Sequence, residues 1–140
     1  MLSYITELKV QNALYANPLS GLPGNVPIQQ KMQSWLDKQY EFSILYIDLD
    51  NFKAFNDYYS FEQGDIVLKS ISTFLQNQIT ENSSFLGHIG GDDFIILSRI
   101  VDELDDMAQK ILDQFDLLIR NYYKKEDVEQ NGISGLDRDG

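Results

Sequence analysis

The sequence contains no cysteine and a single histidine, His88, among its 140 residues. Disulfide bonds, cysteine-ligated zinc and thiol nucleophiles are therefore excluded, and so are metal sites built from several histidines. The hydrophobic runs are too short to span a bilayer, and the first residues lack the basic-then-apolar order of a signal peptide. These absences predict a cytoplasmic protein, or the cytoplasmic part of a larger and membrane-anchored one, without membrane insertion of this segment.

Basic residues are also scarce. The chain has 11 Lys and Arg residues against 22 Asp and Glu residues, which gives a net charge of −11. This balance argues against a nucleic-acid-binding protein, which needs clustered positive charge to hold the phosphate backbone. It leaves room for a nucleotide ligand, since divalent cations bridge phosphates to carboxylates. The hydrophobic content of 43% predicts a folded domain with a core of its own.

The most informative segment is Gly90-Gly91-Asp92-Asp93, which has an apolar segment on each side. Glycine reaches positive φ at no steric cost, so the pattern predicts a hairpin turn between two strands. The predicted strands are residues 84–89 and 94–97. The turn would hold both carboxylates at the tip of a sheet, and the glycines would leave room for a ligand. Acidic residues on turns are also often only solvated.

A second acidic cluster begins at Asp48. Residues 43–47 form an apolar run typical of a buried strand, and Asp50 or Asn51 fits as the N-cap of a helix over residues 52–59. A carboxylate at the end of a strand, followed by a helix N-terminus, suits a metal-bound phosphate. The alternative is an ordinary helix cap beside a strand end. The two clusters together favour the metal site.

Helical periodicity predicts three further helices, over residues 27–39, 62–79 and 102–125. Their apolar faces are expected to be buried, and they contain Met32, Trp35 and Leu36, then Ile66, Val67, Ile71, Phe74, Leu75 and Ile79, then Met107, Ile111, Leu112, Phe115, Leu118 and Ile119. The predicted fold class is α/β, more specifically an α+β sandwich, with a mixed central sheet flanked by helices. Three strands make a small sheet, so a further strand beyond Gly140 is expected. Residues 1–16 form either a helix that packs on the domain or the end of a signalling stalk.

Three segments together resemble the GGDEF domains, the diguanylate cyclases of bacterial cyclic di-GMP signalling. Residues 17–23, Asn-Pro-Leu-Ser-Gly-Leu-Pro, resemble the family's entry motif. Residues 48–57 resemble its Asp-x-Asp-x-Phe-Lys-x-x-Asn-Asp segment, and Gly64-Asp65 follows at the family distance. Residues 90–94 resemble the signature. All three occur in the family's order and spacing, so the resemblance covers residues 17–140 and implies a fold related to adenylyl cyclases and polymerase palms.

The resemblance implies a role for each matching residue. The metal ligands for Mg²⁺ or Mn²⁺ would be Asp48, the carbonyl of Leu49, Asp92 and Asp93, of which the three aspartates would be catalytic. The GTP-binding residues would be Asn56 and Asp65 at the guanine, Asn51, Phe52 and Lys53 at the phosphates, and Gly90 and Gly91 in the turn. The implied reaction converts two GTP molecules into cyclic di-GMP and pyrophosphate, with one GTP on each subunit of a homodimer. The chain would work with other domains of a longer signalling protein.

Several positions depart from the family pattern. Asp93 stands where the family usually has Glu and is one methylene shorter. His88-Ile89 replaces the usual Arg-Tyr, and Ser60-Phe61 replaces Gly-His. Asn17 and Asn25 stand where the family's entry motif has Asp and Arg, so the expected ion pair is absent. Glu81 and Ser84 stand where the family's product-inhibition site has Arg and Asp, so inhibition by product at that site is not expected. The family's last strand and its phosphate-clamping Lys and Arg are missing from the sequence, which predicts a weak or inactive fragment.

Two other functions remain open. A catalytically degenerate module would bind GTP, or only dimerise, and would regulate an attached domain such as a phosphodiesterase. A phosphatase of the Asp-x-Asp type would use Asp48 and Asp50, but Asn51-Phe52 fits poorly where that motif has a small residue and Thr.

Overall fold

The computed structural model describes residues 15–79, 83–100, 104–120 and 122. Its elements follow in the order α2 (Asn25–Asp37), β1 (Ser43–Asp48), α3 (Phe52–Tyr58), α4 (Phe61–Gln76), β2 (Ser84–Gly90), β3 (Asp93–Ser98) and α5 (Leu104–Arg120). The strands form one sheet in the order β1-β3-β2, and every pair among them is antiparallel. The predicted α+β sandwich is confirmed, with antiparallel pairing where a mixed sheet was expected.

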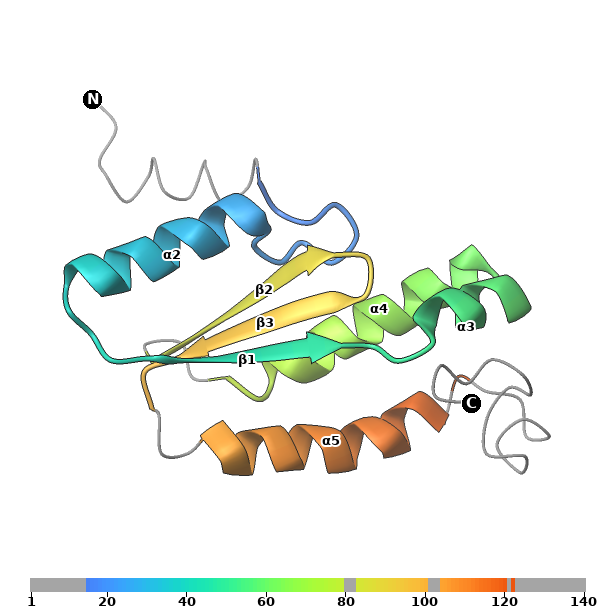
Figure 1. The fold of residues 1–140 in the computed structure, drawn as a ribbon. Coiled ribbons are helices and arrows are strands. Elements are labelled where there is room, and N and C mark those ends of the chain that lie inside the picture. Colours follow the sequence, from blue (N-terminus) through green and yellow to red (C-terminus); the bar gives the residue numbers. More distant parts are fainter. Residues whose placement is uncertain (1–14, 80–82, 101–103, 121, 123–140) are drawn as a thin grey trace.

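Helices cover both faces of this sheet. Figure 1 shows α2 on one face, and α4 and α5 on the other. Ile95 and Leu97 of β3 pack against Ile28 and Trp35 of α2. The opposite face forms the larger cluster, in which residues of β2 and β3 pack with those of α4 and α5: Leu86, Phe94, Ile96, Val67, Ile71, Leu75 and Ile111. The central strand β3 is therefore buried from both sides.

The position of β1 differs from the prediction. The apolar run at residues 43–47 predicts a buried strand, but in the described part of the chain β1 pairs only with β3. Its side chains alternate between half-buried and exposed, and Ile44 and Tyr46 are 47% and 55% exposed. The physical reason is that α2 packs against β2, so it leaves this face of β1 uncovered.

Three residues of the predicted apolar stripes are also exposed, namely Leu36, Ile66 and Leu112. Each lies next to a deeply buried residue, which is Trp35, Val67 or Ile111 respectively. One helical step rotates a side chain by about 100°, so neighbours of a core residue turn away from a narrow contact face. The remaining stripe residues are buried or partly buried, as predicted.

The entry segment before α2 is a loop held by hydrogen bonds of its own. The side chain of Asn17 accepts hydrogen bonds from the backbone N–H groups of Leu19 and Ser20, at 2.9 and 3.2 Å. The N–H of Asn17 bonds to the carbonyl of Leu22, and Ala16 bridges to Pro23. The predicted helix over residues 1–16 lies almost entirely outside the described residues. None of the described helices has the length and apolar character that crossing a membrane requires.

Candidate metal and nucleotide site

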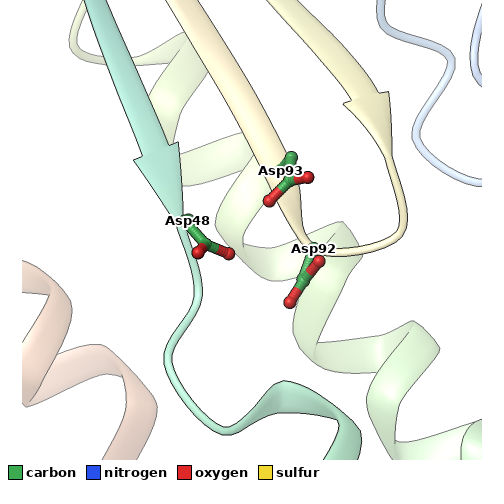
Figure 2. Close-up of side chains that lie close together, drawn as sticks. All are labelled: Asp48, Asp92 and Asp93. Carbon is green, nitrogen blue, oxygen red and sulfur yellow. The ribbon is translucent and has the colours of Figure 1, made fainter.

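Three carboxylates meet at one end of the sheet. Asp48 is the last residue of β1 and pairs directly with Asp93, the first residue of β3. Asp92 lies in the preceding turn. One carboxylate oxygen from each residue lies within 4.8 Å of the others. Figure 2 shows the three side chains directed toward a common space. The structure thus brings Asp48 close to two aspartates that lie more than forty residues further along the sequence.

The hairpin turn has the backbone that its glycines predict. Gly91 has a φ of +44°, a conformation that L side chains rarely adopt. The register shifts between His88 and Gly90, which marks a β-bulge beside the turn. A Cβ added to Gly90 would meet no atom within 4 Å, so this glycine leaves open space. The turn thus combines a backbone conformation that suits glycine with open space beside Gly90.

Two hydrogen bonds hold this turn to the rest of the domain. The N–H of Leu49 donates to the carbonyl of Asp92 at 3.2 Å, which ties the turn to the chain that leaves β1. On the other side, Nε2 of His88 lies 2.9 Å from the carbonyl oxygen of Gly91. Consecutive carbonyls of the turn are therefore bonded to two different parts of the domain.

His88 also reaches the entry loop, a role that the sequence did not predict. Its Nδ1 lies 2.8 Å from Oγ of Ser20, and its backbone N–H donates to the carbonyl of Pro23 at 2.9 Å. The ring stacks on Phe94 at 4.2 Å between centroids, and the residue is 1% exposed. Burial lowers the pKa of His88, although the Gly91 carbonyl and the charges of Asp93 and Asp92 oppose this shift.

The electrostatics of the three carboxylates favour a cation. Like charges at this distance repel one another, and a divalent ion would remove that repulsion. Mg²⁺ and Mn²⁺ prefer hard oxygen ligands about 2.0–2.2 Å away, so oxygens on opposite sides of one ion lie about 4 Å apart. A separation within 4.8 Å is close to that geometry. The donor type and spacing fit Mg²⁺ or Mn²⁺, and the ligands present would be Asp48, Asp92 and Asp93.

The exposed side chain of Tyr46 lies on β1 next to the carboxylate cluster. Tyr46 lies on the same strand face as Asp48, two residues before it, and is diagonal to Asp93 across the β1–β3 pair. A hydrogen bond to Asp93 raises the pKa of Tyr46, and the charges of Asp93, Asp48 and Asp92 raise it further. The three carboxylates therefore make the electrostatic potential at Tyr46 negative.

The start of α3 differs from the predicted helix cap. Asn51 occupies the N-cap position, but it has a φ of +59° and its side chain makes no capping hydrogen bond. The left-handed backbone turns the chain sharply between β1 and the helix, which the capping pattern did not reveal. Phe52 packs on the core and stacks with Phe55, whereas Lys53 is exposed. Of the three predicted phosphate-binding residues, Lys53 is the solvent-facing cation.

The predicted guanine-binding residues lie on two closely packed helices. Asn56 is on α3 and Asp65 is on α4, next to Gly64. A Cβ at Gly64 would collide with Oδ1 of Asn56, so the glycine permits the close approach. This Oδ1 is buried and has no hydrogen-bond partner among the described residues. Asp65 is exposed. The pair combines an unsatisfied amide oxygen with an accessible carboxylate.

A cavity of about 290 Å³ lies next to Asp48. Apolar side chains of α3, α4 and α5 form most of its lining, together with the chain from Ile47 to Asp50. Of the three clustered carboxylates only Asp48 lines it, and Asn56 and Asp65 do not. The cavity therefore does not connect the carboxylate cluster with Asn56 and Asp65.

The positions of the family's inhibition site give less information. Glu81 lies outside the described residues, and Ser84 is buried at the start of β2. Asp50, the second acid of the phosphatase motif, is exposed and does not belong to the carboxylate cluster.

The fold and site define a class of protein: an α+β domain in which a strand end and an adjacent hairpin turn present clustered carboxylates. The comparison with known protein families shows which family of this class the chain belongs to. The family described as "Diguanylate cyclase, GGDEF domain" matches residues 18–135. The chain belongs to the GGDEF domain family.

Curated relatives include proteins of two named activities. The chain is 30% identical over 121 residues to diguanylate cyclase DgcP of Escherichia coli (strain K12), covering 82% of this chain and 34% of that protein. It is also 30% identical over 106 residues to cyclic di-GMP phosphodiesterase PdeR of the same organism, covering 73% of this chain and 16% of that protein. The chain thus spans about a third or less of the length of these relatives.

Solved structures agree on the fold. Diguanylate cyclase SiaD, in complex with its activator SiaC from Pseudomonas aeruginosa, matches with a TM-score of 0.68 at 22% identity. The match covers 76% of this chain and 43% of that one. The GGDEF domain of DgcB from Caulobacter crescentus, in complex with c-di-GMP, matches with a TM-score of 0.63 at 17% identity, covering 69% and 60%. At these identities the likeness shows the architecture alone.

Proposed function

We propose that the chain is the nucleotide-binding GGDEF domain of a bacterial cyclic di-GMP signalling protein and carries out diguanylate cyclase chemistry on GTP. The observation that carries this proposal is the convergence of Asp48, Asp92 and Asp93 within 4.8 Å. Family membership by itself would also describe a domain that had lost these carboxylates. Their retention and geometry favour metal-dependent phosphoryl transfer.

The three aspartates would hold Mg²⁺ or Mn²⁺, with help from the carbonyl of Leu49. When bound, the metal would lower the pKa of the ribose 3′-hydroxyl and neutralise charge on the α-phosphate and the departing pyrophosphate. In each transfer the 3′-oxygen attacks the α-phosphorus of the second GTP, and the bond to its β-phosphate breaks. Asp93 would help to remove the hydroxyl proton, and its half-buried position at the start of β3, directly opposite Asp48, supports this role.

GTP would be held by residues outside the carboxylate cluster. The partnerless Oδ1 of Asn56 is an acceptor that a guanine N–H would satisfy, and the exposed Asp65 offers a second acceptor. Lys53 provides a positive charge for the phosphates beside Asn51 and Phe52. Gly90 and Gly91 leave the turn open for close approach. Two GTP molecules must meet for the full reaction, so catalysis would need a homodimer with facing sites.

A second candidate is a degenerate module that binds GTP and regulates an attached domain. The observation that favours it is Asp93 in the fourth signature position, where the family usually has Glu. The side chain is shorter by one methylene, and a misplacement of about 1 Å costs about 10²-fold in rate. The relative named as a phosphodiesterase fits a domain of this kind.

Two measurements on the 140-residue chain separate these candidates. Calorimetry with GTP and Mn²⁺ should detect binding in the wild type and none in Asp48→Asn. Incubation with GTP and Mg²⁺ or Mn²⁺, followed by chromatography, should detect slow formation of cyclic di-GMP that Asp93→Glu accelerates. If the wild type and Asp93→Glu both bind GTP and neither forms cyclic di-GMP, the result would support the degenerate module. Absence of GTP binding with metal present would overturn both candidates.

A further inference from the structure

His88 connects two sequence motifs that lie far apart in the chain. It bonds through Nε2 to the carbonyl of Gly91 in the signature turn and through Nδ1 to the hydroxyl of Ser20 in the entry loop, at 2.9 and 2.8 Å. Its ring is stacked on Phe94, and the residue is 1% exposed. A buried and fully bonded imidazole has little freedom to move without its partners.

The hydrogen bonds fix the tautomer of the ring. The Gly91 carbonyl only accepts, so Nε2 must carry the hydrogen. In the neutral ring Nδ1 then accepts from the Ser20 hydroxyl. The oxygen of Ser20 also accepts from the N–H of Leu22 at 3.2 Å. Every polar atom in this chain of bonds therefore has a partner of the correct type.

The hydrogen bond from His88 holds Gly91, the residue before the proposed metal ligand Asp92. Gly91 directly precedes Asp92, and the Asp92 carbonyl is held from the other side by the N–H of Leu49. The Gly91 carbonyl belongs to the peptide plane before Asp92 and the Asp92 carbonyl to the plane after it, so these two hydrogen bonds restrict both planes. The two planes together set the direction in which the Asp92 side chain leaves the backbone.

The entry loop is itself well ordered. Asn17 accepts two backbone hydrogen bonds within the loop, and the N–H of Gly24 donates to the carbonyl of Tyr15 at 3.0 Å. A displacement of this loop would carry Ser20 with it and pull on the imidazole. The loop, His88 and the turn therefore form one continuous set of hydrogen bonds.

We propose that His88 is a positioning residue that couples the entry loop, through Ser20, to the orientation of Asp92 in the metal site. This inference rests on the proposed metal-dependent function. It predicts coupling in both directions: metal binding at the aspartates changes the environment of the imidazole, and loss of the Ser20 hydroxyl weakens metal binding.

The single histidine makes the test direct, because its ring nitrogens are the only imidazole signals of the whole chain. Long-range ¹H–¹⁵N NMR on the 140-residue protein should show the neutral ring with hydrogen on Nε2. Titration with Mg²⁺ alone should shift these signals. Ser20→Ala should lower Mg²⁺ affinity by about tenfold, at the low end of the effects of outer-sphere partners, and Ser20→Thr should restore most of it.

Ser72→Ala is the matched control. It also removes a hydroxyl, one that is buried and donates to the carbonyl of Leu68 within α4, so it should cost stability without changing Mg²⁺ affinity. Ser20 is chosen over His88 because removal of a buried ring could unfold the protein. A ring with hydrogen on Nδ1, or Mg²⁺ binding that leaves both the imidazole signals and the Ser20→Ala affinity unchanged, would overturn the positioning role while the proposed function stands. A wild type that binds neither Mg²⁺ nor GTP would overturn both.

Discussion

Strands β3 and β1 lie side by side but have opposite surroundings. β3 has helices on both faces, and Phe94, Ile96 and Leu97 are completely buried. β1 has one half-buried face and one open face, on which Ile44, Tyr46 and Asp48 follow one another. The carboxylate cluster takes Asp93 from the buried strand and Asp48 from the open one. The site therefore combines a rigid support with an accessible side.

The different burial of the two strands distinguishes buried residues that hold the turn from exposed residues that a ligand could contact. Leu49 and His88 are buried and hold the turn through hydrogen bonds. Asp48 of the carboxylate cluster and Tyr46 beside it are exposed, so their removal should leave the core intact. If this contrast between the strands is correct, substitutions of buried residues should lower stability, and substitutions of the exposed carboxylates should lower metal binding.

The largest effect should come from the core. Ile96→Ala removes a completely buried side chain of β3 and should lower the free energy of unfolding by about 3–4 kcal/mol. Ile44→Ala is the matched substitution on the exposed face of β1 and should cost about 1 kcal/mol or less. Urea denaturation followed by circular dichroism would measure both. Equal losses would show that β1 is covered in solution and that the contrast between the strands is wrong.

The second largest effect should be on metal binding. Asp48→Asn removes one of the three clustered carboxylates and, if these bind the metal as proposed, should lower Mn²⁺ affinity by on the order of 10²-fold, more than the loss of an outer-sphere partner. Stability should stay constant or rise slightly, because one of three repelling charges disappears. Calorimetry gives the affinity and urea denaturation gives the stability.

Asp105→Asn serves as the control, because it removes the same charge from the exposed first turn of α5. It should leave Mn²⁺ affinity unchanged. Substantial unfolding of Asp48→Asn would instead mean that Asp48 is a structural cap at the end of β1.

A smaller effect should separate the two residues proposed to bind guanine. Asp65→Ala removes an exposed acceptor and should lower the preference for GTP over ATP by about two- to tenfold, the value of one hydrogen bond, without loss of stability. Asn56 is half-buried against Gly64, so Asn56→Ala should reduce both the preference and the stability. Competition of GTP and ATP against a fluorescent nucleotide would measure the preference. If Asp65→Ala leaves it unchanged, that residue does not contact the base.

The sequence predicted the convergence of the carboxylates because both signals are local. A strand that stops at Asp48 and a glycine turn before Asp93 each fix a carboxylate at the tip of a strand, and antiparallel pairing then brings the tips together. The exposure of β1 depends on which strand α2 covers. The runs at residues 44–47 and 94–97 are similarly apolar, so composition could not distinguish the edge strand from the central one.

The bond between Ser20 and His88 joins residues 68 positions apart, and no periodic pattern reports such a contact. The left-handed Asn51 was missed for a related reason, since its residue type suits both an ordinary cap and this conformation. Sequence patterns therefore predicted the carboxylates that lie together at the end of the sheet, whereas the hydrogen bonds that hold the turn required the structure.

The smallest expected effect concerns the pH dependence of the buried support. The pKa of His88 is lowered in the folded protein, so the unfolded chain binds a proton more readily. Stability should be independent of this group well above pH 6.5 and should fall as the pH drops below 6.5, levelling off below the folded pKa. NMR titration of the single imidazole should therefore give a midpoint below 6.5. Asp92→Asn should lower this midpoint further, because the charge of Asp92 favours the protonated ring. A midpoint at or above 6.5 would mean that the Gly91 carbonyl and the charges of Asp93 and Asp92 outweigh the effect of burial, and the predicted loss of stability below pH 6.5 would then be wrong.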